Sequence, residues 1–285
     1  MPPVLRCYRC GERYEDPARV RCACGEPLWF ESDAETFDWA DCRERDGMWR
    51  YEPLLPIARP DGIARAAGGT PLVRSERLDD AAGCRVYVKD EGEQPTGAYK
   101  DRGSAVAVPH AVETSGGAVG TVSYGNMAMS TAAHAASLGR ECVVLVPDDI
   151  PPVRLALIDQ YDPTIVRVDG DYGALYGDAL DLSTRLPIAI LVSDAPARIS
   201  GYKTALFEIC EAFAPDAPDA LVLPASSGGF ASGIWLGIRD LEAAGLLPDP
   251  PRVYLVQTVA GDPLTRAFDA GETDPTPLGP DETGE

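Results

Sequence analysis

The sequence contains no apolar run long enough to span a bilayer. Its first residues also lack the apolar core that a secretory signal peptide requires. We therefore expect a soluble, cytoplasmic protein that has no membrane partner. In that compartment the eight cysteines are expected to be reduced, which argues against disulfides.

Basic residues are scarce relative to acidic ones. The 285 residues include 45 Asp and Glu against 25 Lys and Arg, which gives a formal net charge of -20. A field of this sign repels phosphate backbones and anionic lipids, so nucleic acid is excluded as an expected partner. Two explanations of the acidity stay open: adaptation to high salt, and the amino-acid bias of a GC-rich genome.

Lysine is nearly absent, since Lys89, Lys100 and Lys203 are the only three in the chain. Arginine keeps its proton and cannot form a Schiff base, so a retained lysine is a candidate for chemistry that arginine cannot do. Chance survival is the alternative, above all for Lys89 and Lys203. The two histidines, His110 and His134, fall within predicted helices, where we expect structural roles.

Four of the cysteines lie in the first 24 residues. They form two close pairs, Cys7 with Cys10 and Cys22 with Cys24, and a glycine follows each pair. Two such turns can bring four thiolates together around zinc. We expect a structural zinc in a ribbon-like knuckle at 1–30, and an empty relic knuckle is the alternative.

Beyond an irregular stretch at 51–84, strand and helix patterns alternate. Apolar strand runs without polar alternation indicate burial on both faces, hence a parallel sheet. The predicted strands are 85–89, 119–123, 141–146, 164–168, 188–193, 220–224 and 252–257. The predicted helices are 100–113, 126–138, 152–161, 172–185, 203–214 and 230–244.

This repetition is typical of an α/β protein with two doubly wound, open-sheet domains. We expect a smaller α/β domain at 111–200. A larger domain would combine 51–110 with 201–270. The acidic end at 271–285, rich in Pro and Gly, is expected to be disordered.

The densest motif, at 88–103, reads VKDEGEQPTGAYKDRG. Pro95, Thr96 and Gly97 predict a tight turn after the strand. The turn delivers Lys100 to the start of a helix, where partial desolvation and the positive helix end disfavour the ammonium form. A neutral amine there is suited to condense with an aldehyde. An ordinary exposed lysine at a loop–helix junction is the alternative.

Two further motifs each join a strand to a helix. Ser123-Tyr124-Gly125-Asn126 offers the N–H groups of a helix start to a carboxylate, although Ser and Asn also suit a plain helix cap. The small residues at 226–229 let backbone N–H groups converge on a phosphate. Each loop is weak evidence alone, and the order of the three motifs along the chain strengthens it.

Together these motifs closely resemble those of fold-type-II pyridoxal-phosphate (PLP) enzymes and, within them, the threonine synthase family. Similarity covers nearly all of residues 5–270, including 48–51, 68–72 and 201–204. The cysteine knuckle also resembles that of microbial threonine synthases.

The resemblance implies a role for each motif residue. It implies that Lys100 holds PLP as a Schiff base and that Asn126 hydrogen-bonds the hydroxyl of the cofactor ring. The residues implied to hold the cofactor phosphate are Ser226, Ser227, Gly228 and Gly229. The residues implied to contact the substrate are Ser123, Tyr124, Gly125 and Thr96.

Some positions depart from the family pattern. Gln94 stands where Asn is usual, Ala98 where Ser is usual, and Tyr99 where Phe is usual. The loop at 226–230 carries Ser and Phe in place of a Gly-Asn-rich sequence. These departures leave the identity of the substrate more open than the binding of the cofactor.

The reaction implied by the resemblance converts O-phosphohomoserine and water to threonine and phosphate. A threonine or serine dehydratase-like or other β-replacement reaction is the alternative within the class. Arg154 and Lys203 are weaker candidates for the substrate phosphate, since solvated or ion-paired roles are expected for both.

Two hypotheses from other classes also stay open. One is a PLP-binding paralogue impaired in catalysis that acts as a regulator or partner subunit. The other is a zinc-knuckle interaction protein with a relic enzyme body. Family members usually run further, and a late Ser, Thr or Cys faces the pyridine nitrogen; no counterpart follows Gln257, so we expect a truncated or divergent chain. Family analogy favours a homodimer or a monomer.

Overall fold

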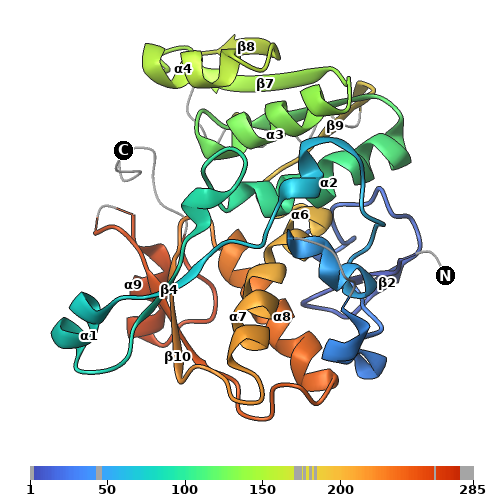
Figure 1. The fold of residues 1–285 in the computed structure, drawn as a ribbon. Helices are drawn as coiled ribbons and strands as arrows, with labels where there is room; N and C mark the ends of the chain where they lie inside the picture. Colours follow the sequence, from blue (N-terminus) through green and yellow to red (C-terminus); the bar gives the residue numbers. More distant parts are fainter. Residues whose placement is uncertain are drawn as a thin grey trace.

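The computed structural model describes residues 3–42, 47–169, 175, 178–179, 182, 185–259 and 261–276 (Figure 1). Helices and strands alternate along most of these ranges, which confirms the predicted α/β class. No helix among the described residues combines the length and apolar character that crossing a membrane requires.

Four parallel strands form the main sheet, in the order β8-β7-β6-β9. The strands are β6 (Ala118–Val122), β7 (Cys142–Pro147), β8 (Thr164–Val168) and β9 (Ile188–Ile190). Parallel neighbours need crossover connections, and α3 (Asn126–Ser137) and α4 (Pro152–Asp159) lie in two of them. The strand order reverses between β6 and β9, so the switch point of the sheet lies at their carboxyl ends.

Burial in this sheet depends on strand position. The inner strands β6 and β7 are mostly buried, whereas β8 at the edge is exposed or half-buried along its length. The prediction of burial on both faces therefore holds for the inner strands and is wrong for β8. An edge strand has one neighbour and fewer covering side chains, which accounts for the difference.

Helix α2 (Lys100–Ser115) crosses the middle of the molecule and contacts α3 and α6 (Pro196–Tyr202) (Figure 1). Glycine makes the approach of α2 to α6 possible. A Cβ on Gly201 would lie 2.0 Å from the carbonyl oxygen of Arg102, and one on Gly103 would lie 2.4 Å from Cγ of Arg198. A larger residue at either position would force the two helices apart.

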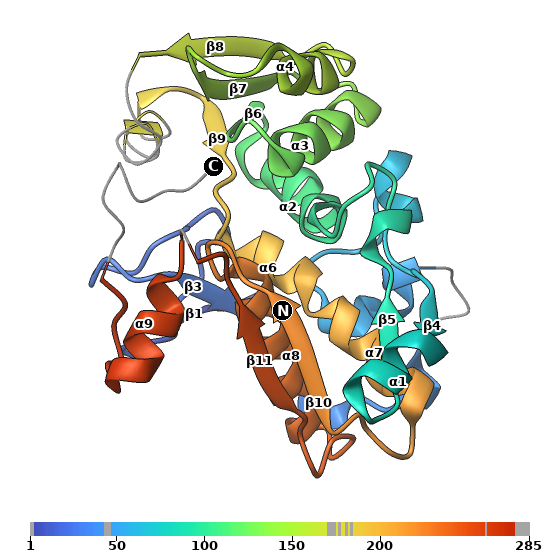
Figure 2. The same cartoon turned by 90° about the vertical axis from the view of Figure 1, so that its left-hand side faces the viewer.

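Two pairs of strands lie at the other end of the molecule. One pair is antiparallel and flanks a short helix: β4 (Leu72–Arg74), α1 (Glu76–Ala82) and β5 (Tyr87–Lys89). The other pair is parallel and is connected through a helix: β10 (Ala220–Pro224), α8 (Gly229–Ala243) and β11 (Arg252–Val256). Helix α8 lies behind β10 and β11 in Figure 2 and shares a hydrophobic core with β10.

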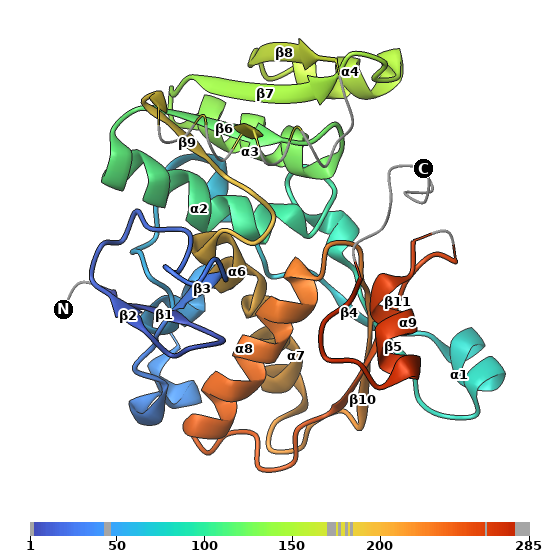
Figure 3. The same ribbon diagram turned by 180° about the vertical axis from the view of Figure 1, so that it is seen from behind.

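The N-terminal segment forms a small antiparallel sheet in the order β2-β1-β3. Its strands are β1 (Leu5–Cys7), β2 (Arg13–Tyr14) and β3 (Leu28–Phe30). The sheet lies beside α2 and α6 (Figure 3), where the rings of Phe30 and His110 are 5.2 Å apart. Arg21 donates to both carboxylate oxygens of Asp194, at 3.0 and 2.8 Å, just before α6 begins.

The remaining described elements are five short 3-10 helices, the core helix α7 and the peripheral helix α9. They are the 3-10 helices η1 (Ala34–Thr36), η2 (Trp39–Asp41), η3 (Gly47–Leu54), η4 (Gly62–Ala66) and η5 (Glu91–Glu93), with α7 (Thr204–Phe213) and α9 (Pro263–Ala270). The division of the chain into a domain at 111–200 and one combining 51–110 with 201–270 stays a prediction.

The sequence and the structure differ at four elements. Strand β4 and helix α1 form within the stretch 51–84, for which irregular structure is predicted. The predicted helix 203–214 is α7, and the separate helix α6 precedes it, opened by Pro196 because the fixed φ of proline suits a first helical turn. Helix α9 is also unpredicted. Most of the predicted helix 172–185 and the tail beyond Thr276 lie outside the described residues.

Candidate active site

Lys100 begins α2 directly after a tight turn. The Gly97 N–H donates to the Gln94 carbonyl at 2.8 Å, and the positive φ of Gly97, 79°, suits glycine. The Lys100 Nζ lies 4.7 Å from the centroid of the Tyr99 ring and 5.8 Å from that of Tyr202. This amine therefore lies beside two aromatic rings.

The structure separates the three lysines by their partners. The Nζ of Lys89 lies 2.6 Å from the carboxylate of Glu208, and that of Lys203 donates to Asp240 at 2.7 Å. Among the described residues, Lys100 has neither an ion pair nor a hydrogen bond through its amine. Lys100 is therefore the lysine whose amine is available for chemistry.

An aromatic cluster joins the lysine turn to the start of α8. Ring centroids of Tyr99 and Phe230 are 4.5 Å apart, those of Tyr99 and Tyr202 are 5.3 Å apart, and those of Tyr202 and Phe230 are 6.0 Å apart. Phe230 is the second residue of α8. The cluster therefore brings the small-residue loop that precedes α8 beside Lys100.

That loop follows β10 and consists of Ser226, Ser227 and Gly228, and Gly229 is the first residue of α8. Gly228 has a φ of 81° and caps the 15-residue helix α8, and a Cβ on it would meet no atom within 4 Å. Within the described part of the chain, no hydrogen bond takes up the backbone N–H of Ser226, Ser227 or Gly228. Open N–H groups at the start of a helix are suited to bind a phosphate.

The loop from Ser123 to Asn126 follows β6 at the switch point of the main sheet. The hydroxyl of Ser123 accepts the N–H of Gly125 at 3.2 Å, and the exposed Asn126 is the first residue of α3. The guanidinium of Arg154 lies 5.2 Å from the centroid of the Tyr124 ring. Ligands of doubly wound sheets bind at this position, so the loop lies where a substrate is expected.

Hydrogen bonds connect the start of α3 to the lysine turn. Ser130, one helical turn after Asn126, donates to the carboxylate of Asp101 at 2.6 Å, and Asp101 directly follows Lys100. Thr96 is buried, and its N–H and hydroxyl both donate to Asp101, at 2.6 and 2.8 Å. The Thr96 hydroxyl is thus engaged within the protein in this structure.

Residues 63–283 match the sequence profile of a family described as pyridoxal-phosphate dependent enzymes. The chain belongs to this family. The threonine synthase of Methanocaldococcus jannaschii is 34% identical over 278 residues, which make up 93% of this chain and 68% of that protein. The threonine synthase of Mycobacterium leprae is 37% identical over 217 residues, covering 75% of this chain and 60% of that protein.

A solved structure shares the fold of this PLP enzyme. An L-serine ammonia-lyase from Rhizomucor miehei superposes with a TM-score of 0.62 at 23% identity, covering 75% of this chain and 69% of that one. At this identity the likeness concerns the fold alone. The chain spans 60% to 69% of the length of these proteins. The resemblance seen in the motifs, and the use of PLP that it implies, are confirmed.

The amine of Lys100 and the backbone N–H groups of the loop at 226–228 fit the cofactor of this PLP enzyme. PLP offers an aldehyde and a phosphate, and the site offers an amine without an ion pair beside a loop with open N–H groups. Burial lowers the pKa of Lys100 to about 8, and the positive charge of Arg198 acts in the same direction. A lowered pKa leaves more of the amine in the neutral form that attacks an aldehyde.

Sequence reasoning missed Arg198. This arginine of α6 is fully buried and donates to the hydroxyls of Ser104 at 2.9 Å and Thr131 at 3.1 Å. No motif marks it, and its one signal is an arginine set in the apolar run that opens α6. Its partners are distant in the sequence, so only the fold reveals its position beside Lys100.

The rate at which this PLP enzyme takes up its cofactor is expected to rise with pH, with a midpoint near pH 8. The pKa of Lys100 lies below its ordinary value of 10.5, so the neutral fraction at pH 7 is about 10%, where an ordinary lysine has about 0.03%. The rate of the absorbance change after PLP is mixed with cofactor-free protein measures this midpoint. Arg198→Met should raise the midpoint, and Arg198→Lys should not. A wild-type midpoint near 10 would contradict the assigned environment of Lys100.

Proposed function

We propose that this PLP enzyme catalyses the threonine synthase reaction, in which O-phosphohomoserine and water give threonine and phosphate. The observation that carries the proposal is Lys100, a half-buried amine without an ion pair among the described residues, which begins α2 beside the aromatic cluster that leads into α8. Similarity to a threonine synthase over 93% of the chain supports the choice of reaction.

In this proposal the parts of the site have distinct tasks. Bound PLP supplies an aldehyde that condenses with amines and a ring that withdraws electrons from the attached carbon. Lys100 holds the cofactor and, once released, moves protons at Cα and Cβ of the substrate. The side chain of Asn126 hydrogen-bonds the hydroxyl of the cofactor ring and so orients the ring. The N–H groups at 226–229 hold the cofactor phosphate, and those after Ser123 hold the substrate carboxylate.

A cation beside the substrate loop favours a substrate that carries a phosphoester over a substrate with an uncharged side chain. Arg154 is exposed, lies over the ring of Tyr124, and has no carboxylate partner among the described residues. The chain as a whole carries a formal charge of -20, so an unpaired cation at this loop stands out. A dianionic phosphate would be attracted to it, and the hydroxyl of serine would not.

Replacing Arg154 with glutamine is therefore expected to raise KM for O-phosphohomoserine by about tenfold, which corresponds to one charge-assisted contact. The kcat should change by less than about threefold, because the phosphate contact is made in the bound substrate and the transition state alike. Arg140→Gln, an exposed arginine beyond the other end of α3, is the matched control and should change neither constant. An unchanged KM in Arg154→Gln would exclude this contact.

The test of the proposed reaction is a comparison of substrates on the PLP-loaded protein. O-phosphohomoserine should yield phosphate and threonine in equal amounts, and L-serine and L-threonine should yield little ammonia. Ammonia from the amino acids without phosphate release would favour a dehydratase. Cofactor binding without any turnover would favour a paralogue impaired in catalysis, and either result would overturn the proposal.

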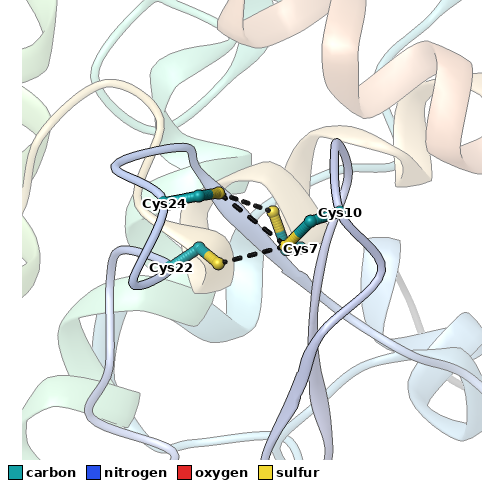
Figure 4. A group of neighbouring side chains, drawn as sticks. All are labelled: Cys7, Cys10, Cys22 and Cys24. Carbon is teal, nitrogen blue, oxygen red and sulfur yellow. Dashed lines mark hydrogen bonds between the residues drawn. The ribbon is translucent and has the colours of Figure 1, made fainter.

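We also propose that the cysteine knuckle binds a structural zinc ion. The four Sγ atoms lie within 4.8 Å of one another, and the shortest separations are 3.5 Å for Cys10–Cys22 and 3.6 Å for Cys7–Cys24 (Figure 4). Four sulfurs bound tetrahedrally at about 2.3 Å from zinc are about 3.8 Å apart, so the cluster has the size of such a site. The Tyr14 hydroxyl accepts the N–H of Ala23 at 3.0 Å and can donate to the Cys22 sulfur, 3.2 Å away.

Removing this metal should unfold the knuckle. A thiol-compatible chelator is expected to release about one zinc per chain and to lower the melting temperature by several degrees, since bound metal contributes folding energy. Cys10→Ser should abolish zinc retention, whereas Cys84→Ser, an exposed cysteine outside the cluster, should retain it. Metal analysis and thermal unfolding measure both effects. A metal-free wild-type protein of unchanged stability would show a relic knuckle.

Assembly and location follow from the family resemblance and the composition alone. We propose a homodimer, with a monomer as the alternative, in the cytoplasm. Sedimentation of the PLP-loaded protein distinguishes the two assembly states.

A further inference from the structure

Asp101 lies next to Lys100 and closes the turn that presents it. This carboxylate is fully buried. It accepts the Thr96 N–H at 2.6 Å, the Thr96 hydroxyl at 2.8 Å and the Ser130 hydroxyl at 2.6 Å. Two of these three donors belong to the residue four positions before Lys100. The carboxylate therefore fixes both ends of the segment that determines where the amine points.

The contacts continue from Asp101 to a buried cation. The hydroxyl oxygens of Ser130 and Ser104 are 2.7 Å apart, and Arg198 donates to Ser104 at 2.9 Å. Asp101, Ser130, Ser104 and Arg198 are hereafter the hydroxyl bridge. A guanidinium can only donate and a carboxylate can only accept, so both hydroxyl protons must point from Arg198 towards Asp101.

All four members of the hydroxyl bridge are at most 1% exposed, and they come from three helices. Asp101 and Ser104 belong to α2, Ser130 to α3 and Arg198 to α6. A buried charge without a partner is costly, and the bridge joins the carboxylate and the guanidinium by a path of hydrogen bonds. The lysine turn is thereby tied to the helix that follows the substrate loop and to the helix that carries Arg198.

The other ionisable groups facing Asp101 do not neutralise it directly. The Nδ1 of His134 lies 3.7 Å from the carboxylate, but its N–H donates to the Ser130 carbonyl at 2.8 Å. Burial lowers the pKa of His134, which favours its neutral form. Burial likewise keeps Tyr202 protonated by raising its pKa. The charge on Asp101 is therefore balanced through the hydroxyl bridge.

We propose that Asp101 is the positioning residue of Lys100, which it holds towards the cofactor aldehyde through Thr96 and the hydroxyl bridge. The inference rests on the proposed role of Lys100 and adds the group that directs its amine. Asparagine at 101 would keep the shape but present one acceptor oxygen, and its NH₂ group would face an N–H or O–H donor. The turn would then shift, and a misplacement of about 1 Å can cost about 100-fold in rate.

The experiment measures the rate constant of PLP uptake by cofactor-free protein on both sides of pH 8. Asp101→Asn is expected to lower the plateau rate at high pH by about 10- to 100-fold. Ser130→Ala breaks the bridge but leaves the bonds from Thr96 to Asp101, so a smaller loss of about threefold to tenfold is expected. Asp90→Asn is the matched control, since this exposed carboxylate accepts only the Gly92 N–H among the described residues, and it should match the wild type.

The pH profile separates positioning from other roles. A lower plateau with an unchanged pH midpoint, in variants whose melting temperature stays above the assay temperature, is the expected result. A wild-type plateau in both Asp101→Asn and Ser130→Ala would overturn the proposal, as would a change in the midpoint alone, which would show an effect of charge only. Lys100→Ala distinguishes a failure of the proposed function from a failure of the positioning role. If Lys100→Ala takes up PLP as fast as the wild type, the proposed function fails; if it does not and Asp101→Asn is unaffected, only the positioning role fails.

Discussion

Replacing Lys100 with alanine is expected to abolish the absorbance band of protein-bound PLP and to lower turnover by about 10³-fold or more. No other lysine can take over, because Lys89 and Lys203 are held by Glu208 and Asp240. The fold should survive, since the Lys100 amine has no ion pair within the described residues and its loss strands no buried carboxylate. Absorbance spectra measure the loss of the band, thermal unfolding measures the stability of the fold, and phosphate release measures turnover. The expected loss of rate is typical of a group that transfers protons.

Two further lysine variants sharpen this test. Lys100→Arg keeps the positive charge but cannot condense with an aldehyde, so it should be as inactive as the alanine variant. Lys203→Arg keeps a cation opposite Asp240 and should retain both the band and the turnover. An active Lys100→Arg would show that the amine is not required and would remove the basis of the proposed function.

A second large effect is expected on stability, at Arg102. Its guanidinium is fully buried between two carboxylates. It donates to both oxygens of Glu91 at 2.7 Å and to those of Glu208 at 2.7 and 2.8 Å. Lys89 also contacts the carboxylate of Glu208, so two cations and two carboxylates balance. This network anchors the first turn of α2, next to Asp101 of the hydroxyl bridge.

Arg102→Met should destabilise the protein by about 3–5 kcal/mol, because it leaves two carboxylates sharing the single charge of Lys89. Denaturant unfolding of the cofactor-free protein measures the change, and Arg85→Met, an exposed arginine, should alter stability by less than about 0.5 kcal/mol. A loss below about 1 kcal/mol in Arg102→Met would show that the network contributes little.

The same network predicts that the stability of the folded protein falls at low pH. Burial alone would raise the pKa of Glu208, but the charges and hydrogen bonds of Arg102 and Lys89 outweigh it and lower the pKa to about 2. A carboxyl whose pKa is lower in the folded state stabilises the protein above its ordinary pKa, 4.5, and loses this contribution as the pH falls towards 2. In Arg102→Met the pKa of Glu208 should rise, so acid unfolding should begin at a higher pH.

Local chemistry made the lysine turn predictable. Pro95 and Gly97 favour a turn, and α2 begins at Lys100 as the sequence predicts. The inner strands β6 and β7 were equally accessible to prediction, since apolar runs of their length need burial on both faces. Strand β11 shows the limit of this reasoning. Its pattern is as apolar, yet all five of its residues are exposed, because β10 is its only neighbour among the described strands.

The groups that adjust the site could not be predicted in this way. Asp101 belongs to a motif, but its bond to Ser130 spans 29 residues, and the bond of Arg198 to Ser104 spans 94. Periodicity and local propensity carry no information about such pairs. Helix α6 was not predicted for a related reason. Gly201 lowers its helix propensity, and only the contact with Arg102 explains why glycine is needed there.

The most direct test of the account is to reduce the PLP-loaded protein with borohydride and to locate the pyridoxyl group by peptide mass spectrometry. We predict one modified site, in the peptide that contains Lys100, and unmodified Lys89 and Lys203. Modification of either of those two lysines, or of none, would contradict the assignment of the active site.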